Sequence, residues 1–380
     1  MNSALINGRV FDGEVLHEGM AVVLEHGSVS ALLPDNDIPD TVDVSWDLEG
    51  HILAPGLIDI QVNGGGGVMF NDAPTVETIR RIGAAHRRFG TTGFLPTLIS
   101  TDSDTMRQAI EAVEQAIAMG VPGVLGIHLE GPYLNAEKRG IHNADRFRPI
   151  DEPAISLLTS LASGCTLVTI APELTSPEII SRLTAAGVLV FGGHSAASYQ
   201  QTRESLQAGL RGFTHLFNAM SPFESREPGM VGAALEDRNS WFGIIADGQH
   251  VHPATFAVAI AAKRKGYAVL VTDAMASVGS DIKKSTFDGD KIEVVDGSCR
   301  MQTGELAGSD LDMISAARNA VRFAGIDALE ALRMASSYPA AALGLESHLG
   351  FIRRGYTASF IELDDELNLY RSWIDGEVNE

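Results

Sequence analysis

The segment Ile127-His-Leu-Glu130-Gly-Pro-Tyr133 decides the fold of this chain of 380 residues. A short apolar run ends at a carboxylate, and glycine and proline follow at once. Two later segments repeat this order with a histidine in place of the glutamate, Phe191-Gly-Gly-His194-Ser195 and Gly212-Phe-Thr-His215-Leu-Phe-Asn218. In parallel α/β proteins the chemistry lies at the carboxyl ends of the strands, so these segments predict one site on a barrel rim.

The side chains at these three strand ends suit a divalent metal ion. Two neutral imidazoles and one carboxylate bind Zn²⁺ well, and Fe²⁺ or Mn²⁺ could occupy the same ligands. A lone buried histidine is ordinarily a hydrogen-bonded core residue, but glutamate is rarely buried unless it is paired or metal-bound. We therefore favour a ligand set of Glu130, His194 and His215, with an open position for water that is typical of catalysis.

Outward from these segments, short apolar runs alternate with amphipathic helices, which predicts βαβ units and a parallel sheet. Helix signals lie between the runs, such as the N-cap Ser176 before Pro177. Eight strands imply a closed (β/α)₈ barrel, an α/β fold, within residues 55–344. The expected strands are residues 56–62, 93–98, 124–129, 166–170, 188–192, 212–216, 242–246 and 268–271.

The two ends of the chain differ from the barrel and read as short strands broken by turn signals such as Asn7-Gly8 and His26-Gly27. We predict that residues 1–54 and 345–380 meet as one small β domain. A further β insertion is expected at residues 279–304, where two strand-like runs flank Asp296-Gly297. It is predicted to be a hairpin and could act as a flap over the site.

Composition excludes several classes of protein. The net charge of −21 argues against nucleic acid and anionic membrane partners, which need a basic surface. The only two cysteines, Cys165 and Cys299, are too few for a disulfide scaffold or a thiolate metal cluster. No apolar run is long enough to cross a bilayer, and the N-terminus lacks the features of a secretory signal, so we expect a cytoplasmic protein.

Eight short sequence motifs, taken together, resemble those of the amidohydrolase superfamily and, within it, the N-acetylglucosamine-6-phosphate deacetylases. Any one string would be weak, but the set spans most of the chain in family order. The strings are Ala54-Pro-Gly-Leu-Ile-Asp-Ile-Gln61-Val-Asn63-Gly, His128-Leu-Glu130-Gly-Pro-Tyr, Gly140-Ile-His142-Asn, Gly193-His194-Ser, Thr214-His215-Leu-Phe-Asn218-Ala219-Met, Asp247-Gly-Gln-His250, Val271-Thr-Asp273-Ala-Met and Leu306-Ala-Gly-Ser309.

The resemblance implies a distorted (β/α)₈ barrel with a β-sandwich built from both termini. Members of the superfamily with two metals usually carry His-x-His at the end of the first strand, where this chain has Gln61-Val-Asn63. An amide is a poor ligand beside imidazole, so the resemblance implies a single metal ion at Glu130, His194 and His215. A second, weakly held metal ion stays an alternative to the single ion.

The resemblance also implies catalytic roles for two residues. Asp273 would be the general acid/base that takes a proton from water and returns it to the leaving amine, whereas its ordinary role would be a helix N-cap. His142 would polarise the acetyl carbonyl, whereas a loop histidine is most often a solvated surface residue.

The substrate contacts that the resemblance implies fall into two groups. Asn218, Ala219, Arg226 and His250 would hold a phosphate, although Arg226 read by itself would be a surface salt bridge. The acetyl and sugar parts of the substrate would contact residues on three other segments. These residues are Gln61, Asn63, Ile141, His142, Leu306, Ala307 and Gly308.

The activity implied is hydrolysis of N-acetyl-D-glucosamine 6-phosphate to glucosamine 6-phosphate and acetate. The alternatives are deacetylation of the galactosamine epimer or another amidohydrolase reaction, and, more remotely, a noncatalytic assembly protein on the same fold. The resemblance further implies a homodimer in which Arg226 reaches the site of the neighbouring subunit. Epimer preference and the native metal stay open.

Overall fold

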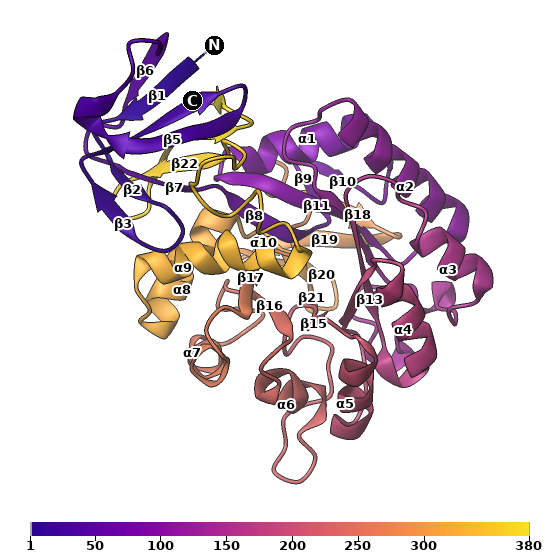
Figure 1. Ribbon diagram of the computed structural model, residues 1–380. Coiled ribbons are helices and arrows are strands. Elements are labelled where there is room, and N and C mark those ends of the chain that lie inside the picture. Colours follow the sequence, from indigo (N-terminus) through magenta and orange to yellow (C-terminus); the bar gives the residue numbers. More distant parts are fainter. Residues whose placement is uncertain (1, 380) are drawn as a thin grey trace.

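The computed structural model describes residues 2–379, which form a parallel barrel with two mixed sheets from the chain termini at one side (Figure 1). The barrel strands follow one another in sequence order around the sheet. They are β8 (Leu57–Val62), β11 (Thr91–Ile99), β12 (Gly126–Glu130), β13 (Cys165–Ile170), β14 (Leu189–Gly192), β15 (Gly212–Phe213), β16 (Trp241–Ile245) and β17 (Ala268–Val271).

The eight predicted strands are therefore confirmed, with one clear difference at β15. This strand has two residues, whereas the sequence pattern predicted a strand over residues 212–216. The backbone of His215 has a φ of 31°, which takes the chain out of the extended conformation. The barrel closes between its first and last strands, where the Asp273 N–H donates to the carbonyl of Gln61 over 3.0 Å.

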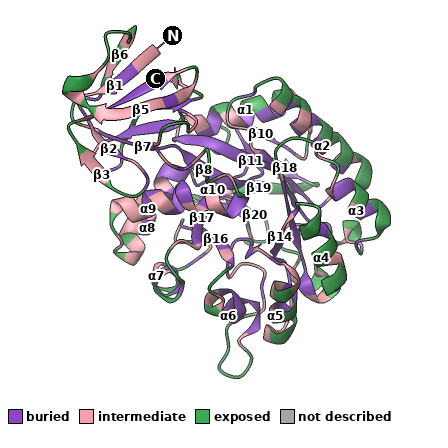
Figure 2. Ribbon diagram, viewed as in Figure 1, coloured by how far each residue is buried: buried purple, intermediate pink, exposed green. Residues whose placement is uncertain are grey.

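Helices surround the barrel, whose strands are buried, and most helices expose their outer faces (Figure 2). The helices at residues 229–236 and 337–343 are instead largely buried. The predicted N-cap is confirmed, because the Ser176 side chain accepts from Ile179 N. Gly120 follows the second helix with a φ of +63°. The helices are α1 (Val76–Arg87), α2 (Ser103–Ala118), α3 (Glu152–Leu158), α4 (Pro177–Ala185), α5 (Tyr199–Ala208), α6 (Gly229–Glu236), α7 (Pro253–Ala262), α8 (Met313–Ala324), α9 (Ala328–Ala335) and α10 (Ser337–Leu343).

The two terminal sheets enclose a separate core that includes Leu5, Leu53, Phe360 and Trp373. One sheet has the order β5-β4-β1-β6, and the other has the order β24-β23-β22-β7-β2-β3. Strands from both ends of the chain thus pair in one sheet. Their bounds are β1 (Asn2–Ile6), β2 (Arg9–Phe11), β3 (Leu16–Glu18), β4 (Met20–Glu25), β5 (Ser28–Pro34), β6 (Val44–Asp47), β7 (Ile52–Pro55), β22 (Phe360–Leu363), β23 (Leu369–Ile374) and β24 (Glu377–Asn379).

The insertion after the last barrel strand is larger than a hairpin. The predicted pair around Asp296-Gly297 is present as β19 (Asp290–Val295) and β20 (Ser298–Met301). β18 (Lys284–Phe287) and β21 (Leu306–Ser309) add an edge on each side, which gives a four-stranded antiparallel sheet. Its inner face packs with Met69, Ile99 and Met275 of the barrel end.

Smaller elements complete the chain. The glycine-rich run after β8 forms a two-stranded sheet of β9 (Gly64–Gly65) and β10 (Val68–Met69). Short 3₁₀ helices occur at η1 (Asp35–Asp37), η2 (Ala136–Lys138), η3 (Ala144–Arg146) and η4 (Pro172–Leu174). Within residues 2–379, every helix is too short or too polar to span a lipid bilayer.

Candidate active site

Four charged or imidazole side chains meet at the carboxyl ends of the barrel strands. Glu130 is the last residue of β12, while His194, His215 and Asp273 each come two residues after β14, β15 and β17. All four line one cavity of about 200 Å³. The strand-end pattern in the sequence thus corresponds to one shared rim, as expected for a parallel barrel.

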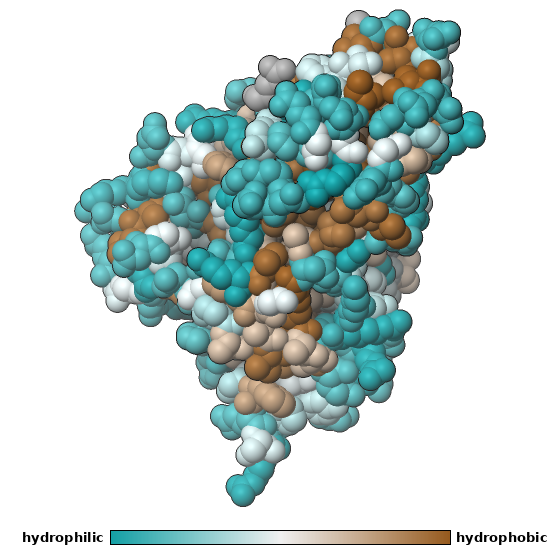
Figure 3. Space-filling model, turned by 90° about the vertical axis from the view of Figure 1, so that its left-hand side faces the viewer, coloured by the Kyte–Doolittle hydropathy of each residue, from teal (hydrophilic) through white to brown (hydrophobic). Residues whose placement is uncertain are grey.

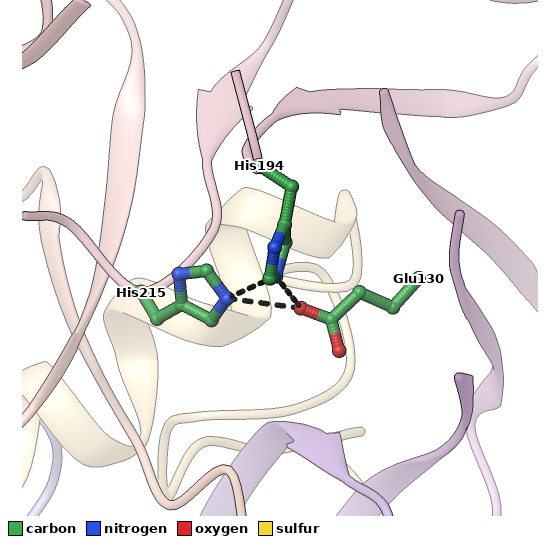
Figure 4. A group of neighbouring side chains, drawn as sticks. All are labelled: Glu130, His194 and His215. Atoms are coloured by element: carbon green, nitrogen blue, oxygen red, sulfur yellow. Dashed lines mark hydrogen bonds and ion pairs between the residues drawn. The ribbon is translucent and has the colours of Figure 1, made fainter. Parts of the chain in front are cut away.

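Glu130, His194 and His215 form a compact buried group (Figure 4). The Glu130 Oε1 atom lies 3.2 Å from His194 Nε2 and 3.0 Å from His215 Nε2, and the two Nε2 atoms are 3.0 Å apart. Ligands of a tetrahedral zinc ion, each about 2.1 Å from the metal, are separated by about 3.4 Å. Among residues 2–379 this is the one group of its kind close enough to share an ion.

The hydrogen bonding of His194 fits metal binding. Its Nδ1 donates to the carbonyl oxygen of Lys138 over 2.7 Å, which leaves the lone pair on Nε2, the atom that faces Glu130 and His215. A metal-bound histidine usually donates its other ring N–H to a backbone carbonyl or a carboxylate in this way. The donor set therefore fits a divalent ion in both chemistry and direction.

Electrostatics in this group are dominated by burial and by close opposite charge. Burial by itself would raise the pKa of Glu130, but the hydrogen bonds from His194 and His215 hold it well below the usual value. Burial would lower the pKa of His215, yet its hydrogen bond and attraction to Glu130 raise it. Glu130 is thus an ionised carboxylate, which is the form that binds a cation.

Asp273 is held by two amides from β8 and the residue after it. Gln61 Nε2 and Asn63 Nδ2 both donate to Asp273 Oδ1, over 3.1 and 2.6 Å. Gln61 Nε2 is also 3.2 Å from Glu130 Oε1, so it links the two carboxylates. Burial, and then repulsion by Glu130, raise the pKa of Asp273 to about 6. A carboxyl group with this pKa can accept and return a proton near neutral pH.

The expected substrate contacts divide into two sets. Those at the cavity wall are Ile141, His142, Asn218, Ala219, His250, Leu306 and Gly308. Gln61 and Asn63 are instead buried behind Asp273, Ala307 is buried in the core under the inserted sheet, and Arg226 is exposed on the loop before α6. The two amides donate hydrogen bonds to Asp273, and their direct contact with substrate stays a prediction.

The phosphate donors differ in how they are engaged. Asn218 Nδ2 donates to the carbonyls of His215 and Leu216, so its side-chain donors are occupied. The Ala219 N–H has no hydrogen-bond partner among residues 2–379, and Ala219 lies at the cavity with a φ of 50°. His250 Nδ1 bonds to Asp247 Oδ2 over 2.6 Å, which leaves Nε2 as its second polar atom. Backbone N–H groups in such bends bind anions.

Sequence patterns missed several residues that hold the site together. Ser100 contacts His142, Glu173 accepts bonds from Ser195 and Ala196 beside His194, and Asp59 bonds to Thr272 beside Asp273. Ser100 follows β11 directly, so the strand-end rule could have found it. Glu173 and Asp59 gave no such signal, because their partners are distant in sequence.

Comparison with known proteins supplies the family. The sequence pattern described as "Amidohydrolase family" matches residues 52–378, which is most of the chain. The chain belongs to the amidohydrolase family. A relative from Shewanella sp. (strain ANA-3), named N-acetylgalactosamine-6-phosphate deacetylase, is 43% identical over 364 residues, which is 96% of this chain and 92% of the relative.

Two solved structures of amidohydrolases are similar over the whole chain. The N-acetylglucosamine-6-phosphate deacetylase from Pasteurella multocida has a TM-score of 0.96 at 34% identity, and the match covers 100% of both chains. A mutant of the corresponding enzyme from Mycobacterium smegmatis, in complex with N-acetyl-D-glucosamine-6-phosphate, has a TM-score of 0.90 at 31% identity and covers 100% of this chain and 98% of that one. The similar amidohydrolases thus include deacetylases named for the galactosamine sugar phosphate and deacetylases named for the glucosamine sugar phosphate.

Proposed function

We propose that this amidohydrolase removes the acetyl group from an N-acetylhexosamine 6-phosphate, with N-acetyl-D-glucosamine 6-phosphate as the first candidate substrate. The products are glucosamine 6-phosphate and acetate. The observation that carries the proposal is the buried Glu130, His194 and His215 group beside Asp273, in one cavity with His142 and the Ala219 N–H. Similarity to deacetylases of hexosamine 6-phosphates supplies the substrate class.

The metal in this proposal is a single divalent ion, Zn²⁺ first and Fe²⁺ or Mn²⁺ as alternatives, held by Glu130, His194 and His215. A bound divalent ion supplies Lewis acidity, which makes water a stronger acid and a carbonyl carbon a better electrophile. The amides Gln61 and Asn63 are poor ligands and already donate to Asp273, which supports one ion and not two.

The residues of this chain divide the proton transfers and charge stabilisation between them. Because Oδ1 of Asp273 accepts from both amides, its Oδ2 takes the proton of the attacking water and later gives it to the leaving amine. His142 donates a hydrogen bond to the acetyl oxygen as that oxygen becomes negative. The Ala219 N–H and His250 hold the phosphate end.

A specific finding favours the galactosamine epimer as a second candidate substrate. The Shewanella relative at 43% identity is named for N-acetylgalactosamine 6-phosphate, whereas the glucosamine-type structures are 34% and 31% identical. Acetate release from both epimers, with and without the phosphate, tests the proposal on zinc-loaded protein. We expect release from a phosphorylated N-acetylhexosamine, with the glucosamine epimer preferred. Release from neither phosphorylated sugar would refute the activity, and preference for the other epimer would reassign the substrate.

We further propose a homodimer in which Arg226 reaches the phosphate site of the partner. Arg226 is exposed and has no hydrogen-bond or ion-pair partner among residues 2–379. Its loop projects from the lower end of the molecule, and hydrophobic residues gather on the face above it (Figure 3). A groove there is lined by Phe217, Phe223 and Val258, of which Phe223 is 66% exposed. An apolar surface next to an unpaired guanidinium fits a contact between subunits.

Mixed dimers distinguish an arginine that acts across the interface from one that acts within its own subunit. A dimer of one Arg226→Ala chain and one Asp273→Asn chain keeps one complete site only if Arg226 acts on the partner. Co-expression with two affinity tags should therefore restore about half of the wild-type activity. Activity no higher than that of the Arg226→Ala homodimer would refute the contribution in trans, and a monomer in sedimentation would refute the dimer.

A further inference from the structure

Ser100 lies beside Nδ1 of the His142 ring, at the carboxyl end of β11. Its Oγ is 2.7 Å from His142 Nδ1, and its backbone N–H points at the same nitrogen over 3.4 Å. Both residues are buried, with exposed fractions of 8% for Ser100 and 2% for His142. Two polar atoms of one residue thus converge on one ring nitrogen.

The direction of these contacts determines where the imidazole proton lies. A backbone N–H can only donate, so Nδ1 must be the acceptor and cannot carry a hydrogen. In a neutral imidazole the proton is then on Nε2. That atom is 4.0 Å from Glu130 Oε2, which is too long for a hydrogen bond, and the ring lines the cavity.

The loop after β12 leaves room for this arrangement. Gly131 has a φ of +86°, and a Cβ at that position would collide with Ser100 Oγ. The Ser100 hydroxyl is also 3.3 Å from the Glu130 carbonyl, but that contact is longer than the one to Nδ1. The hydroxyl therefore donates preferentially to the ring. His142 Nδ1 then accepts from two donors, the hydroxyl and the backbone N–H of Ser100.

We propose that Ser100 is a positioning residue that holds His142 in the tautomer with its proton on Nε2, the nitrogen that faces the cavity. With the opposite tautomer, Nε2 would present a lone pair to the acetyl oxygen and repel it as negative charge develops. The proposal rests on the proposed function for the role of His142, but the tautomer itself is a property of the protein without substrate.

Nitrogen-15 spectroscopy of the histidine rings tests the tautomer without any activity measurement. The sample is the zinc-loaded full-length protein, and the His142 signals are assigned by their absence from a His142→Gln sample. We expect Nδ1 of His142 to have the shift of an unprotonated nitrogen and Nε2 that of a protonated one. A protonated Nδ1 in the wild-type protein would overturn the proposal, even if the enzyme is an active deacetylase.

Three variants test the contribution of the hydroxyl. Ser100→Ala should give His142 a mixture of tautomers and lower kcat about ten-fold with little change in KM, because only the weaker N–H donor is left. Ser100→Thr keeps the hydroxyl and should restore the single tautomer of His142 and the wild-type kcat. Ser205→Ala is the matched control, because Ser205 is also buried, in α5, and its hydroxyl donates only to the Gln201 carbonyl.

The outcomes separate positioning from simple packing. An unchanged tautomer and an unchanged kcat in Ser100→Ala would overturn the proposal. A loss of activity that Ser100→Thr does not restore, or that Ser205→Ala shows equally, would also overturn it, because packing or stability would then be the cause. Absence of deacetylase activity in the wild-type protein would refute the proposed function alone, since the ring spectra would still report the tautomer.

Discussion

Two regions of this protein place side chains in the left-handed backbone conformation, for two different reasons. At the tips of hairpins in the terminal sheets and the insertion, an exposed residue with positive φ precedes a glycine, as at His26, Asp288, Asp296 and Asp375. On the barrel rim, His194, His215 and Asp273 have φ values of 47°, 31° and 53° without a hairpin turn. Buried residues that adopt this conformation outside turns therefore mark the site.

The cause in each region is different in kind. Two-residue hairpins need positive φ to match the twist of their strands, so local geometry alone requires it. At the rim the conformation is held by distant partners: Asp273 N donates to the carbonyl of Gln61 on the first strand, and the Asp273 carbonyl accepts from Ser309 N. The barrel as a whole thus aims the side chains of the site into the cavity.

The largest effect is expected for Asp273→Asn. The amide cannot accept the proton of the attacking water, so turnover should fall by about 10⁴. The three metal ligands are untouched, and the metal content should stay at the wild-type level. Acetate release and elemental analysis measure the two quantities. A fully active variant would remove Asp273 from the mechanism and leave its conformation unexplained.

His194→Asn separates ligand chemistry from backbone conformation. Asparagine tolerates a positive φ, so the metal-free protein should lose about 1 kcal/mol or less in its free energy of unfolding, the cost of the bond to the Lys138 carbonyl. Activity should nevertheless fall by about 10³, because one metal ligand is lost. Denaturant unfolding and acetate release provide the test. Retained activity would show that His194 is not a ligand.

Asp59→Asn tests how burial of acids under the rim shapes the pH dependence of stability. Burial raises the pKa of Asp59 from 3.8 to about 7, so the folded protein binds its proton more tightly than the unfolded chain does. This stabilisation is complete below pH 3.8 and is lost as the pH rises towards 7, at about 1.4 kcal/mol per pH unit. Unfolding of the metal-free variant at pH 5 to 8 should lack this slope. If the variant kept the wild-type dependence of unfolding free energy on pH, Asp59 would not be the group responsible for it.

The terminal sheets should show the opposite dependence. Burial would raise the pKa of Asp12, but hydrogen bonds from Val15 N, His17 and Glu14 N hold it below the usual value. Its stabilisation is therefore present above pH 3.8 and is lost as the pH falls further. Asp12→Asn measured in parallel with Asp59→Asn should lose stability at neutral pH, where Asp59→Asn gains it.

The smallest effect is expected for His26→Asn, the hairpin counterpart of His194→Asn. His26 has a φ of 49°, close to that of His194, but it is exposed in the turn between β4 and β5. Asparagine favours this conformation, so stability should change by a few tenths of a kcal/mol at most, and kcat should not change. A loss of activity here would mean that positive φ alone does not separate the two regions.

Much of this structure was predictable because its signals are local. The eight barrel strands, the Ser176 cap and the hairpin at Asp296-Gly297 follow from hydrophobic period and turn chemistry within a few residues. The metal-binding group was predictable because Glu130, His194 and His215 lie at or just after the ends of strands, and a parallel barrel brings strand ends together.

The rest of the site depends on contacts between distant segments. The hydrogen bonds that Gln61 and Asn63 donate to Asp273 were not predicted, because Asp273 lies more than 200 residues later in the sequence. Ser100 follows a strand end, but no local pattern linked it to His142, and Glu173 gave no signal that linked it to His194. The insertion was predicted as a hairpin because the sequences of β18 and β21 have only a weak strand pattern. These two strands form by pairing with β19 and β20.

A metal titration of the metal-free protein, with acetate release from N-acetyl-D-glucosamine 6-phosphate and its galactosamine epimer as the readout, tests the central claim most directly. The claim is that one ion at Glu130, His194 and His215 supports deacetylation of a hexosamine 6-phosphate. We predict that activity rises linearly with added Zn²⁺ and stops rising at one equivalent per chain. No acetate release from either sugar, or activity that requires two equivalents, would contradict the account.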